Sequence, residues 1–271
     1  MRYIDLINKY RKVESIEQEA IKFLIAEISG FSFSQLYLNL QSEIDDELLV
    51  RLEEAISKYV NNNIPVQYIV GYTYFLGNKI FVDNNVLIPR NETEEVVIEA
   101  TKLFPKDSFI SICDVGTGSG VIAICLKKHY TNSYVLGIDI EAKAIEVARA
   151  NISNANIDVT LKKNDLLKGI EQKFDLIISN PPYIDPNEKV MGLVYDNEPH
   201  SALFSPNEGL YHYEEILKYS KTNLRKDGYI VFEVAYNKKQ EMIRLVSKFY
   251  KEFTIMKDSH NNDRIMIIKG D

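Results

Sequence analysis

The chain has 271 residues, 45% of them apolar and 26% charged, which is the composition of a globular protein with room for one large domain and one small one. Its net charge of −7 and pI of about 5.3 argue against a large phosphate-tracking surface, so a protein or small-molecule substrate is favoured over naked DNA. No stretch holds about 18 apolar residues in a row, and the amino terminus has no apolar signal region. We therefore expect a cytoplasmic protein without membrane contact.

Residues 1–62 are predicted to form an acidic helical domain. Ile21, Leu24, Ile25 and Ile28 recur with the spacing of one helix face, Ser15 with Gln18 suits a capping box, and a second helix should begin at about Asp45. We interpret this domain as the part that recognises the substrate. The alternative is a cap that only stabilises the catalytic domain.

Residues 63–92 are predicted to be a linker that contains a β-hairpin. Turn-forming residues and a proline occupy 61–65, and two β-rich runs at 68–75 and 79–82 are separated at Gly77-Asn78. An extended piece from residue 86 then enters a helix that Asn91 is expected to cap.

Residues 93–271 are predicted to form an α/β domain, because strands and helices alternate from Phe109 onward. Such alternation indicates a mostly parallel sheet with helices on both faces. The final two strands have no room for a helix between them and should pair antiparallel. The expected strands are 109–114, 134–139, 157–162, 174–179, 228–234, 252–257 and 264–269, and the expected helices are 120–129, 141–151, 209–224 and 238–249.

Cysteine and histidine usage indicates neither a disulfide framework nor a metal site. Cys113 and Cys125 fall on a predicted strand and a predicted helix, so we expect both to be buried apolar residues. The four histidines show neither ligand spacing nor a nucleophile partner. They are His129, His200, His212 and His260.

A glycine-rich loop, Asp114-Val115-Gly116-Thr117-Gly118-Ser119-Gly120, follows the first strand of the predicted sheet. Glycines in such a turn let the backbone approach a ligand, and Asp139 at the end of the next strand is suited to accept hydrogen bonds from ribose hydroxyls. The third glycine comes one residue too early for a dinucleotide fingerprint, which would place it at Val121. This spacing resembles the S-adenosylmethionine loop of class I methyltransferases.

That resemblance implies a Rossmann-like catalytic domain that binds S-adenosyl-L-methionine and releases S-adenosyl-L-homocysteine. It implies cofactor contacts from the glycine loop, from Asp139, and from Asn164 and Asp165 near the adenine ring. The residues assigned to the cofactor are Asp114, Gly116, Thr117, Gly118, Gly120, Asp139, Asn164, Asp165 and Asn180.

The sequence Asn180-Pro181-Pro182-Tyr183 follows the apolar run 174–179, which is typical of a buried strand that ends abruptly. The motif resembles that of amino-methyltransferases, whose target nitrogens are poor nucleophiles because their lone pair is delocalised. The Asn180 side-chain oxygen and the Pro181 carbonyl are suited to hold the target N–H groups, and Tyr183 to stack on the amide. Asn180, Pro181 and Tyr183 are therefore the expected catalytic residues.

Further segments specify the family. They are 65–71, the Arg90-Asn91-Glu92-Thr93-Glu94 stretch, Glu198-Pro199 with Ala202-Leu203, Gly209-Leu210, and Asp258 with Asn262-Asp263-Arg264. Together these look like the peptide chain release factor glutamine methyltransferase family (HemK/PrmC), over roughly residues 60–269. Asn91 replaces a usual proline and Ala235 a usual glycine.

The family resemblance implies methylation of the glutamine side-chain nitrogen in the Gly-Gly-Gln motif of class I release factors. The expected substrate contacts are the Asn180–Tyr183 motif, Arg90 and Glu198, and we expect a monomer that does not bind nucleic acid directly. One rival is a nucleic-acid adenine or guanine N-methyltransferase, against which the acidity argues. The other is a non-catalytic module that retains the cofactor pocket, against which the intact motif argues.

Overall fold

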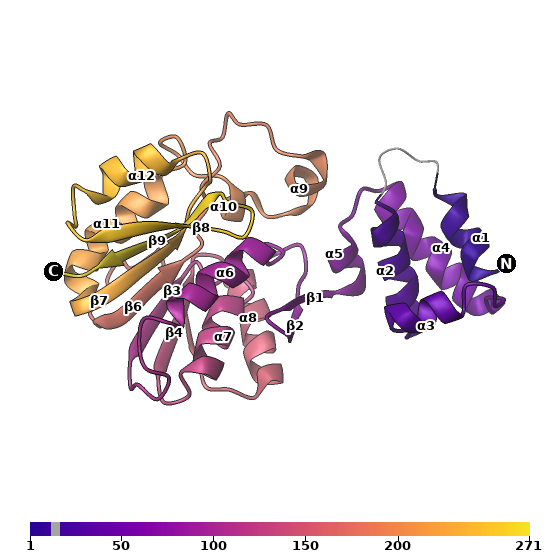
Figure 1. The fold of residues 1–271 in the computed structure, drawn as a ribbon, viewed down its shortest axis with the longest axis horizontal. Coiled ribbons are helices and arrows are strands. Elements are labelled where there is room, and N and C mark those ends of the chain that lie inside the picture. The colour runs from indigo at the N-terminus through magenta and orange to yellow at the C-terminus, as the bar shows by residue number, and fades with distance from the viewer. Residues whose placement is uncertain (12–16) are drawn as a thin grey trace. The chain divides into compact units, whose positions relative to one another are not determined.

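The structure, a computed structural model, describes residues 1–11 and 17–271 and divides into two compact units. One unit comprises Met1–Tyr72 with Val190–Asn197, and the other comprises Thr73–Lys189 with Glu198–Asp271 (Figure 1). The expected domain limits at residues 62 and 92 stay a prediction. The expected capping box of Ser15 lies outside the described residues.

The first unit is helical around its own apolar core, as predicted. Ile21, Leu24 and Ile25 are buried, and the Asp45 side chain accepts hydrogen bonds from the N–H groups of Glu47 and Leu48, which caps the long fourth helix. The helices are α1 (Tyr3–Lys9), α2 (Gln18–Ser29), α3 (Phe33–Leu38), α4 (Asp46–Val60), α5 (Val66–Val70) and α9 (Gly192–Asn197).

The prediction of strand for residues 68–70 is wrong, because these residues belong to helix α5. Pro65 stands at its N-cap and accepts hydrogen bonds from the N–H groups of Tyr68 and Ile69, and Gly71 ends the helix with φ of 81°. The side chain of Ile69 packs against the helical core. Packing of this partly buried helix against the core therefore outweighs the β propensity of the apolar run.

The predicted hairpin is present, with its turn one residue earlier than expected. Strands β1 (Tyr72–Phe75) and β2 (Asn78–Phe81) form a two-stranded sheet joined by Leu76 and Gly77. Both connecting residues have positive φ, 44° and 73°. This backbone matches the strand twist in a tight two-residue hairpin.

The second unit contains the predicted sheet, with strand order β5-β4-β3-β6-β7-β9-β8. The first five are parallel, and β9 runs antiparallel to both β7 and β8, which confirms the predicted fold class. Asp114 pairs in register with Gly137 of β4 and Ile178 of β6, so the ends of three strands meet. The strands are β3 (Ser111–Val115), β4 (Tyr134–Asp139), β5 (Thr160–Lys163), β6 (Phe174–Ser179), β7 (Leu224–Glu233), β8 (Phe253–Lys257) and β9 (Asp263–Lys269).

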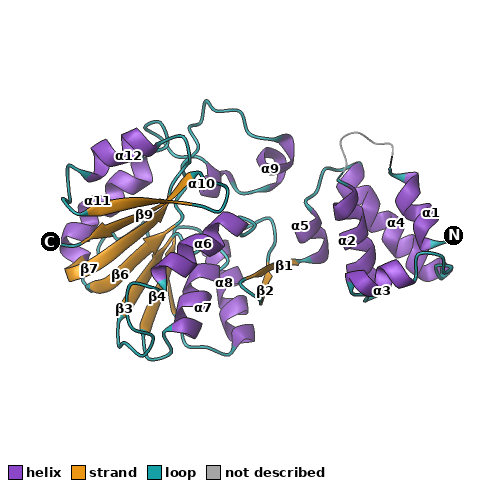
Figure 2. Ribbon diagram, in the orientation of Figure 1, coloured by secondary structure: helices purple, strands orange, loops and turns teal. Residues whose placement is uncertain are grey.

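Helices cover both faces of this sheet (Figure 2). One face carries α6 (Asn91–Ala100), α7 (Val121–His129) and α8 (Ala142–Ala155), and the other carries α11 (Tyr211–Asn223) and α12 (Lys239–Val246). The short α10 (His200–Leu203) lies in the connection after β6. Cys113 and Cys125 are buried in this unit, as predicted. No helix within the described ranges is long and apolar enough to cross a membrane.

Helix α6 begins at Asn91, so the expectation that Asn91 caps it is wrong by one residue. Arg90 is the N-cap, with an extended backbone (φ −98°, ψ 153°) and no capping side-chain hydrogen bond. The extended segment that the sequence predicts before this helix brings Arg90 to the edge of the sheet where the strands end. That edge is where open α/β sheets bind ligands.

Candidate active site

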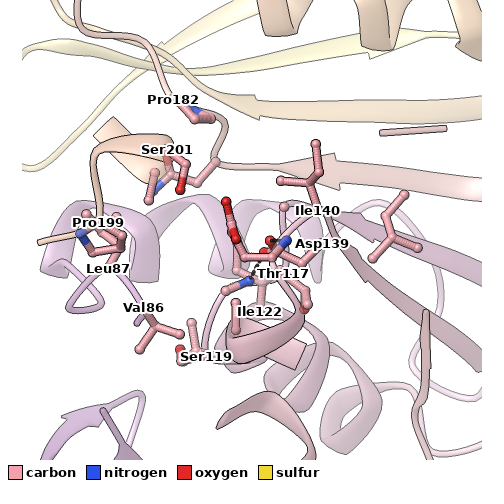
Figure 3. A pocket seen from close by; sticks show the side chains of 18 of the residues that line it. Val86, Leu87, Thr117, Ser119, Ile122, Asp139, Ile140, Pro182, Pro199 and Ser201 are labelled. Atoms are coloured by element: carbon pink, nitrogen blue, oxygen red, sulfur yellow. Dashed lines mark hydrogen bonds between the residues drawn. The ribbon is translucent and has the colours of Figure 1, made fainter. Parts of the chain in front are cut away.

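A cavity opens at the carboxyl ends of β3, β4, β5 and β6. Figure 3 shows side chains from several segments facing one space, with Thr117 and Asp139 near its middle and Val86, Leu87, Pro182 and Ser201 around them. Its walls come from the glycine loop, the ends of β4 and β5, the Asn180 motif, residues 85–89 and residues 199–202. Eight of the expected site residues line it: Gly116, Thr117, Gly118, Asp139, Asn164, Asp165, Asn180 and Pro182.

The glycine loop leaves its backbone open to the cavity. Gly116 and Gly118 have φ of 73° and 53°, and a Cβ built on either residue would meet no atom within 4 Å. The N–H groups of Gly116 and Thr117 both donate to the carbonyl of Ile138, at 2.9 and 2.8 Å, which fixes the loop against β4. A ligand can therefore approach the backbone here in space that any side chain would partly fill.

Asp139 presents a fixed carboxylate to the cavity. One oxygen accepts the Gly118 N–H at 2.9 Å and the other accepts the Glu141 N–H at 3.0 Å. Burial raises the pKa of this carboxyl, and the two backbone donors oppose the shift. The remaining lone pairs of both oxygens are suited to accept hydroxyl groups of a ligand.

Asp114 and Gly120 do not line the cavity. Their contacts with neighbouring residues hold the glycine loop in place. The Asp114 carboxylate is fully buried and accepts the Thr117 hydroxyl at 2.6 Å and the Ala123 N–H at 3.2 Å, while its second oxygen has no partner among the described residues. Burial raises the pKa of Asp114 to about 7. A Cβ on Gly120 would lie 3.2 Å from that of Ala148, so this glycine permits close packing of α7 on α8.

Asn164 and Asp165 border the cavity beyond the end of β5. The Asn164 N–H donates to the Asp139 carbonyl at 2.8 Å, and its side-chain NH₂ donates to the carbonyls of Leu166 and Lys168. His212 of α11 faces the same end of the cavity with its Nδ1 against the Ser205 hydroxyl at 2.8 Å. These bonds hold a short polar loop in one conformation.

Of the Asn180 motif, Asn180 and Pro182 reach the cavity. Pro181 is buried, and the partly buried Tyr183 packs against the hydrophobic core of this unit and does not line the cavity. Burial raises the pKa of Tyr183 to about 12. The Ser179 hydroxyl donates to the Val115 carbonyl at 2.6 Å, which joins the end of β6 to that of β3. The motif thus stands directly beside the glycine loop.

Arg90 and Glu198 pair with each other and do not line the cavity. The Arg90 guanidinium donates to the Glu198 carboxylate, which also accepts the Ile88 N–H at 3.2 Å and is nearly inaccessible to solvent. The two residues follow and precede segments that do line the cavity, 85–89 and 199–202. Their ion pair therefore links segment 85–89 to segment 199–202.

Comparison with known proteins identifies the chain. It is 35% identical to the release factor glutamine methyltransferase of Streptococcus pneumoniae, over 93% of this chain and 91% of that one. The corresponding protein of Enterococcus faecalis is 34% identical over 98% of both chains. The chain belongs to the release factor glutamine methyltransferase family. Two family models also match, the PrmC N-terminal domain at residues 9–71 and the methyltransferase small domain at residues 100–196.

Solved structures share the fold. A methyltransferase from Pyrococcus furiosus superimposes with a TM-score of 0.56 at 18% identity, covering 83% of this chain and 98% of that one. A 16S rRNA methyltransferase from T. thermophilus, solved with AdoMet and guanosine, gives a TM-score of 0.55 at 13% identity, covering 74% and 50%. At such identities the likeness establishes the methyltransferase fold of the family and nothing more specific.

The two departures from the usual family pattern leave the backbone undisturbed. Asn91 occupies the first position of α6, where proline is favoured but not required. Ala235 is buried after β7 and is not among the described residues with positive φ, so its backbone does not need glycine. Both substitutions fit the family fold without strain.

Several residues that line the cavity carry no signal in a single sequence. Apolar side chains make up much of the cavity wall, and no motif sets them apart from core residues. They are Val86, Leu87, Val121, Ile122, Ile138, Ile140, Ala144 and Leu166. Thr93 lies within the family-specific stretch after Arg90, but its place beside Asn180 comes only from the fold. No cluster of three His, Cys, Asp or Glu side chains placed to hold a metal occurs in residues 1–11 and 17–271.

Proposed function

We propose that this protein transfers a methyl group from S-adenosyl-L-methionine to the side-chain nitrogen of the glutamine in the Gly-Gly-Gln motif of class I release factors. Family membership supports the reaction. The observation that carries the site assignment is the side chain of Asn180, which faces a cavity bordered by the open glycine loop and the Asp139 carboxylate.

The cavity fits the cofactor by its shape and its donor set. The backbone of Gly116 and Gly118 would contact the amino-acid portion of the cofactor. The Asp139 carboxylate would accept hydrogen bonds from its ribose hydroxyls, and Asn164 and Asp165 would contact its adenine edge. The apolar walls exclude water from the rest of the molecule. When bound, the cofactor supplies an electrophilic methyl group on a sulfonium.

Asn180 and Pro181 would orient the target amide. The Asn180 side-chain oxygen and the Pro181 carbonyl each accept one N–H of the glutamine NH₂ group, which turns the nitrogen lone pair toward the methyl group. Alignment then supplies most of the catalysis, and the nitrogen loses a proton after it has been methylated. Tyr183 lies outside the cavity lining, so its proposed stacking on the amide requires the glutamine to enter beside this ring.

Arg90 and Glu198 would act on the substrate through the walls they join. Their ion pair is buried on the Glu198 side, so the Glu198 carboxylate is not accessible to the release factor. We propose that the pair keeps 85–89 and 199–202 closed around the bound cofactor. Replacing Arg90 tests how much this pair contributes to the free energy of unfolding and to cofactor binding.

The proposed reaction is tested by radiolabel transfer. The protein is incubated with methyl-labelled cofactor and either a class I release factor or the same factor with its Gly-Gly-Gln glutamine replaced by alanine. We expect label in the first sample and none in the second. Equal labelling of both would overturn the proposed target.

A nucleic-acid substrate finds no support in the comparisons, and the acidic composition opposes it. Incubation with rRNA, tRNA or DNA in place of the release factor should give no labelled product. The monomeric state and the cytoplasmic location remain part of the proposal.

Replacing Asp139 by alanine should weaken cofactor binding about ten- to a hundredfold. The variant loses an acceptor for ribose hydroxyls, and a hydrogen bond to a charged group contributes roughly 1.5–3 kcal/mol. Isothermal calorimetry measures the affinity. Asp158→Ala, on the loop before β5, is the control that should bind normally, and unchanged affinity in a folded Asp139 variant would move the ribose contact elsewhere.

We propose that the helical unit docks the release factor. On α3, Phe33, Tyr37 and Leu38 expose large apolar surfaces, with Leu38 85% accessible. Leu38→Ser should raise KM for the release factor roughly tenfold, since an apolar anchor contributes about 1.5 kcal/mol, and should leave cofactor affinity unchanged. Phe109→Ser is the control, because this equally exposed ring lies before β3, at the opposite edge of the sheet from the cavity. Equal KM values for the two variants would place docking elsewhere.

A further inference from the structure

The Asn180 side chain belongs to a hydrogen-bonded relay of three side chains, which come from three different segments of the chain. The Asn180 side-chain nitrogen lies 3.1 Å from the Thr93 hydroxyl oxygen of α6, and that hydroxyl lies 2.6 Å from a carboxylate oxygen of Glu233 at the end of β7. Thr93 and Glu233 are buried. The relay therefore runs from the cavity wall into the interior of the second unit.

The chemistry of the three groups gives the relay a direction. An ionised carboxylate can only accept, so the single hydrogen of the Thr93 hydroxyl is committed to Glu233. Thr93 can then only accept from Asn180, which requires the NH₂ half of the amide to face Thr93. The amide is planar, so its oxygen points the other way.

We infer that Thr93 and Glu233 are positioning residues that hold the Asn180 amide with its oxygen toward the substrate nitrogen. A flipped amide would present N–H groups to the N–H groups of the target glutamine, and like donors cannot bond. The inference rests on the proposed function, because it assigns a cause to the orientation that methyl transfer needs. The hydrogen bond to Thr93 uses the nitrogen of the Asn180 amide, so the oxygen is the half of the group that can accept from the substrate.

Glu233 is itself held in place by its surroundings. Its backbone carbonyl accepts the Tyr213 hydroxyl at 2.7 Å, and Arg264 of β9 lies beside it, bonded to the Asp258 carboxylate and the Val234 carbonyl. Further charged or titratable groups face it from the N-cap and first turn of α6 and from the loop after β6. They are Arg90, Glu92 and Tyr183. The acceptor end of the relay is thus rigid.

The protonation state of Glu233 decides whether the Thr93 hydroxyl donates to Glu233 or can turn to Asn180. Burial raises the pKa of Glu233 to about 7, although Thr93, Arg264 and Arg90 favour the charged form. When Glu233 is protonated it can donate to Thr93, whose own hydrogen is then free to turn to Asn180, and the amide loses its fixed orientation. Turnover should therefore fall as the pH drops through about 7 and be full at pH 8.

The test uses the full chain, a release factor substrate and four variants, one of which is Asn180→Ala alone. Thr93→Val removes the hydroxyl at nearly constant volume, and Thr93→Ser restores it. The double variant Thr93→Val with Asn180→Ala measures coupling, because residues that act as a unit give non-additive losses. Turnover at saturating substrate and the Kd of the cofactor are measured for each protein from pH 5.5 to 8.5.

We expect Thr93→Val to lower turnover at pH 8 roughly tenfold with unchanged cofactor affinity, and Thr93→Ser to recover most of it. The double variant should be no slower than Asn180→Ala alone. The acidic limb near pH 7 should disappear in Thr93→Val, which separates Glu233 from Asp114, the other carboxyl with a pKa of about 7.

Multiplicative losses in the double variant, or a Thr93→Ser protein as slow as Thr93→Val, would overturn the relay. An acidic limb retained in Thr93→Val would assign that limb to another group and would also contradict it. Failure of the proposed function looks different, because the unmodified protein would then transfer no methyl group to the release factor at any pH.

Discussion

Replacing Asn180 by alanine is expected to lower turnover by about 10²–10³-fold while leaving cofactor affinity nearly unchanged. The expected loss is that of one preorganised polar contact at a reacting centre. Asn180 reaches the cavity from the end of β6, and its side-chain nitrogen donates to the hydroxyl of Thr93, which also borders the cavity. The truncation therefore removes the oxygen that we propose orients the target amide, and it leaves the glycine loop and Asp139 in place.

Asn180→Asp is the finer variant, because it keeps an acceptor oxygen but adds a charge and loses the donor to Thr93. We expect it to retain part of the activity. Asn223→Ala provides the control for a purely structural effect. This buried amide donates to the carbonyls of Ile170 and Gln172, and none of the three residues lines the cavity. The substitution should lower the melting temperature with turnover per folded molecule unchanged. Near-normal turnover in a folded Asn180→Ala would remove Asn180 from the mechanism.

Replacing Arg90 by methionine is expected to lower the free energy of unfolding by about 3 kcal/mol. Its partner Glu198 is almost wholly buried and would keep only the Ile88 N–H, and an uncompensated buried carboxylate is strongly destabilising. Cofactor binding should weaken as well, because the ion pair joins two walls of the cavity. Urea unfolding measures the first effect and calorimetry the second.

Arg225→Met is the matched control for this variant. Arg225 pairs with Asp175 at 2.7 Å on the surface, with about half of the arginine side chain accessible, so its loss should cost less than about 1 kcal/mol. Equal unfolding midpoints for the two variants would show that the Arg90–Glu198 pair stabilises the fold no more than the surface pair does.

The sheet was predictable because its signals are local and repeated. Apolar runs such as 174–179 have the length and composition of buried strands, and β4 and β6 have the predicted bounds. Residues 68–70 show where this reasoning fails, since a short run of Tyr, Ile and Val suits either a strand or a buried helix. Packing against the helical core favours the helix, and the local sequence does not reveal this packing.

The residues that meet at the cavity were predictable where chemistry requires particular residue types at fixed spacing. The glycine loop, Asp139 and Asn180 meet at one edge of the sheet because parallel strands end there. The sequence did not show that Arg90 and Glu198, which lie 108 positions apart, bind each other, nor that Thr93 bonds to Asn180. Such contacts depend on how connections fold back over the sheet.

The most direct test of the central claim is peptide mass spectrometry of a class I release factor incubated with the protein and S-adenosyl-L-methionine. The account predicts that one methyl group appears on the glutamine of the Gly-Gly-Gln peptide, on its side-chain nitrogen, and that the Asn180→Ala protein leaves this peptide almost unmodified. A methyl group on another residue, or an unmodified release factor after incubation with the folded, cofactor-binding protein, would contradict it.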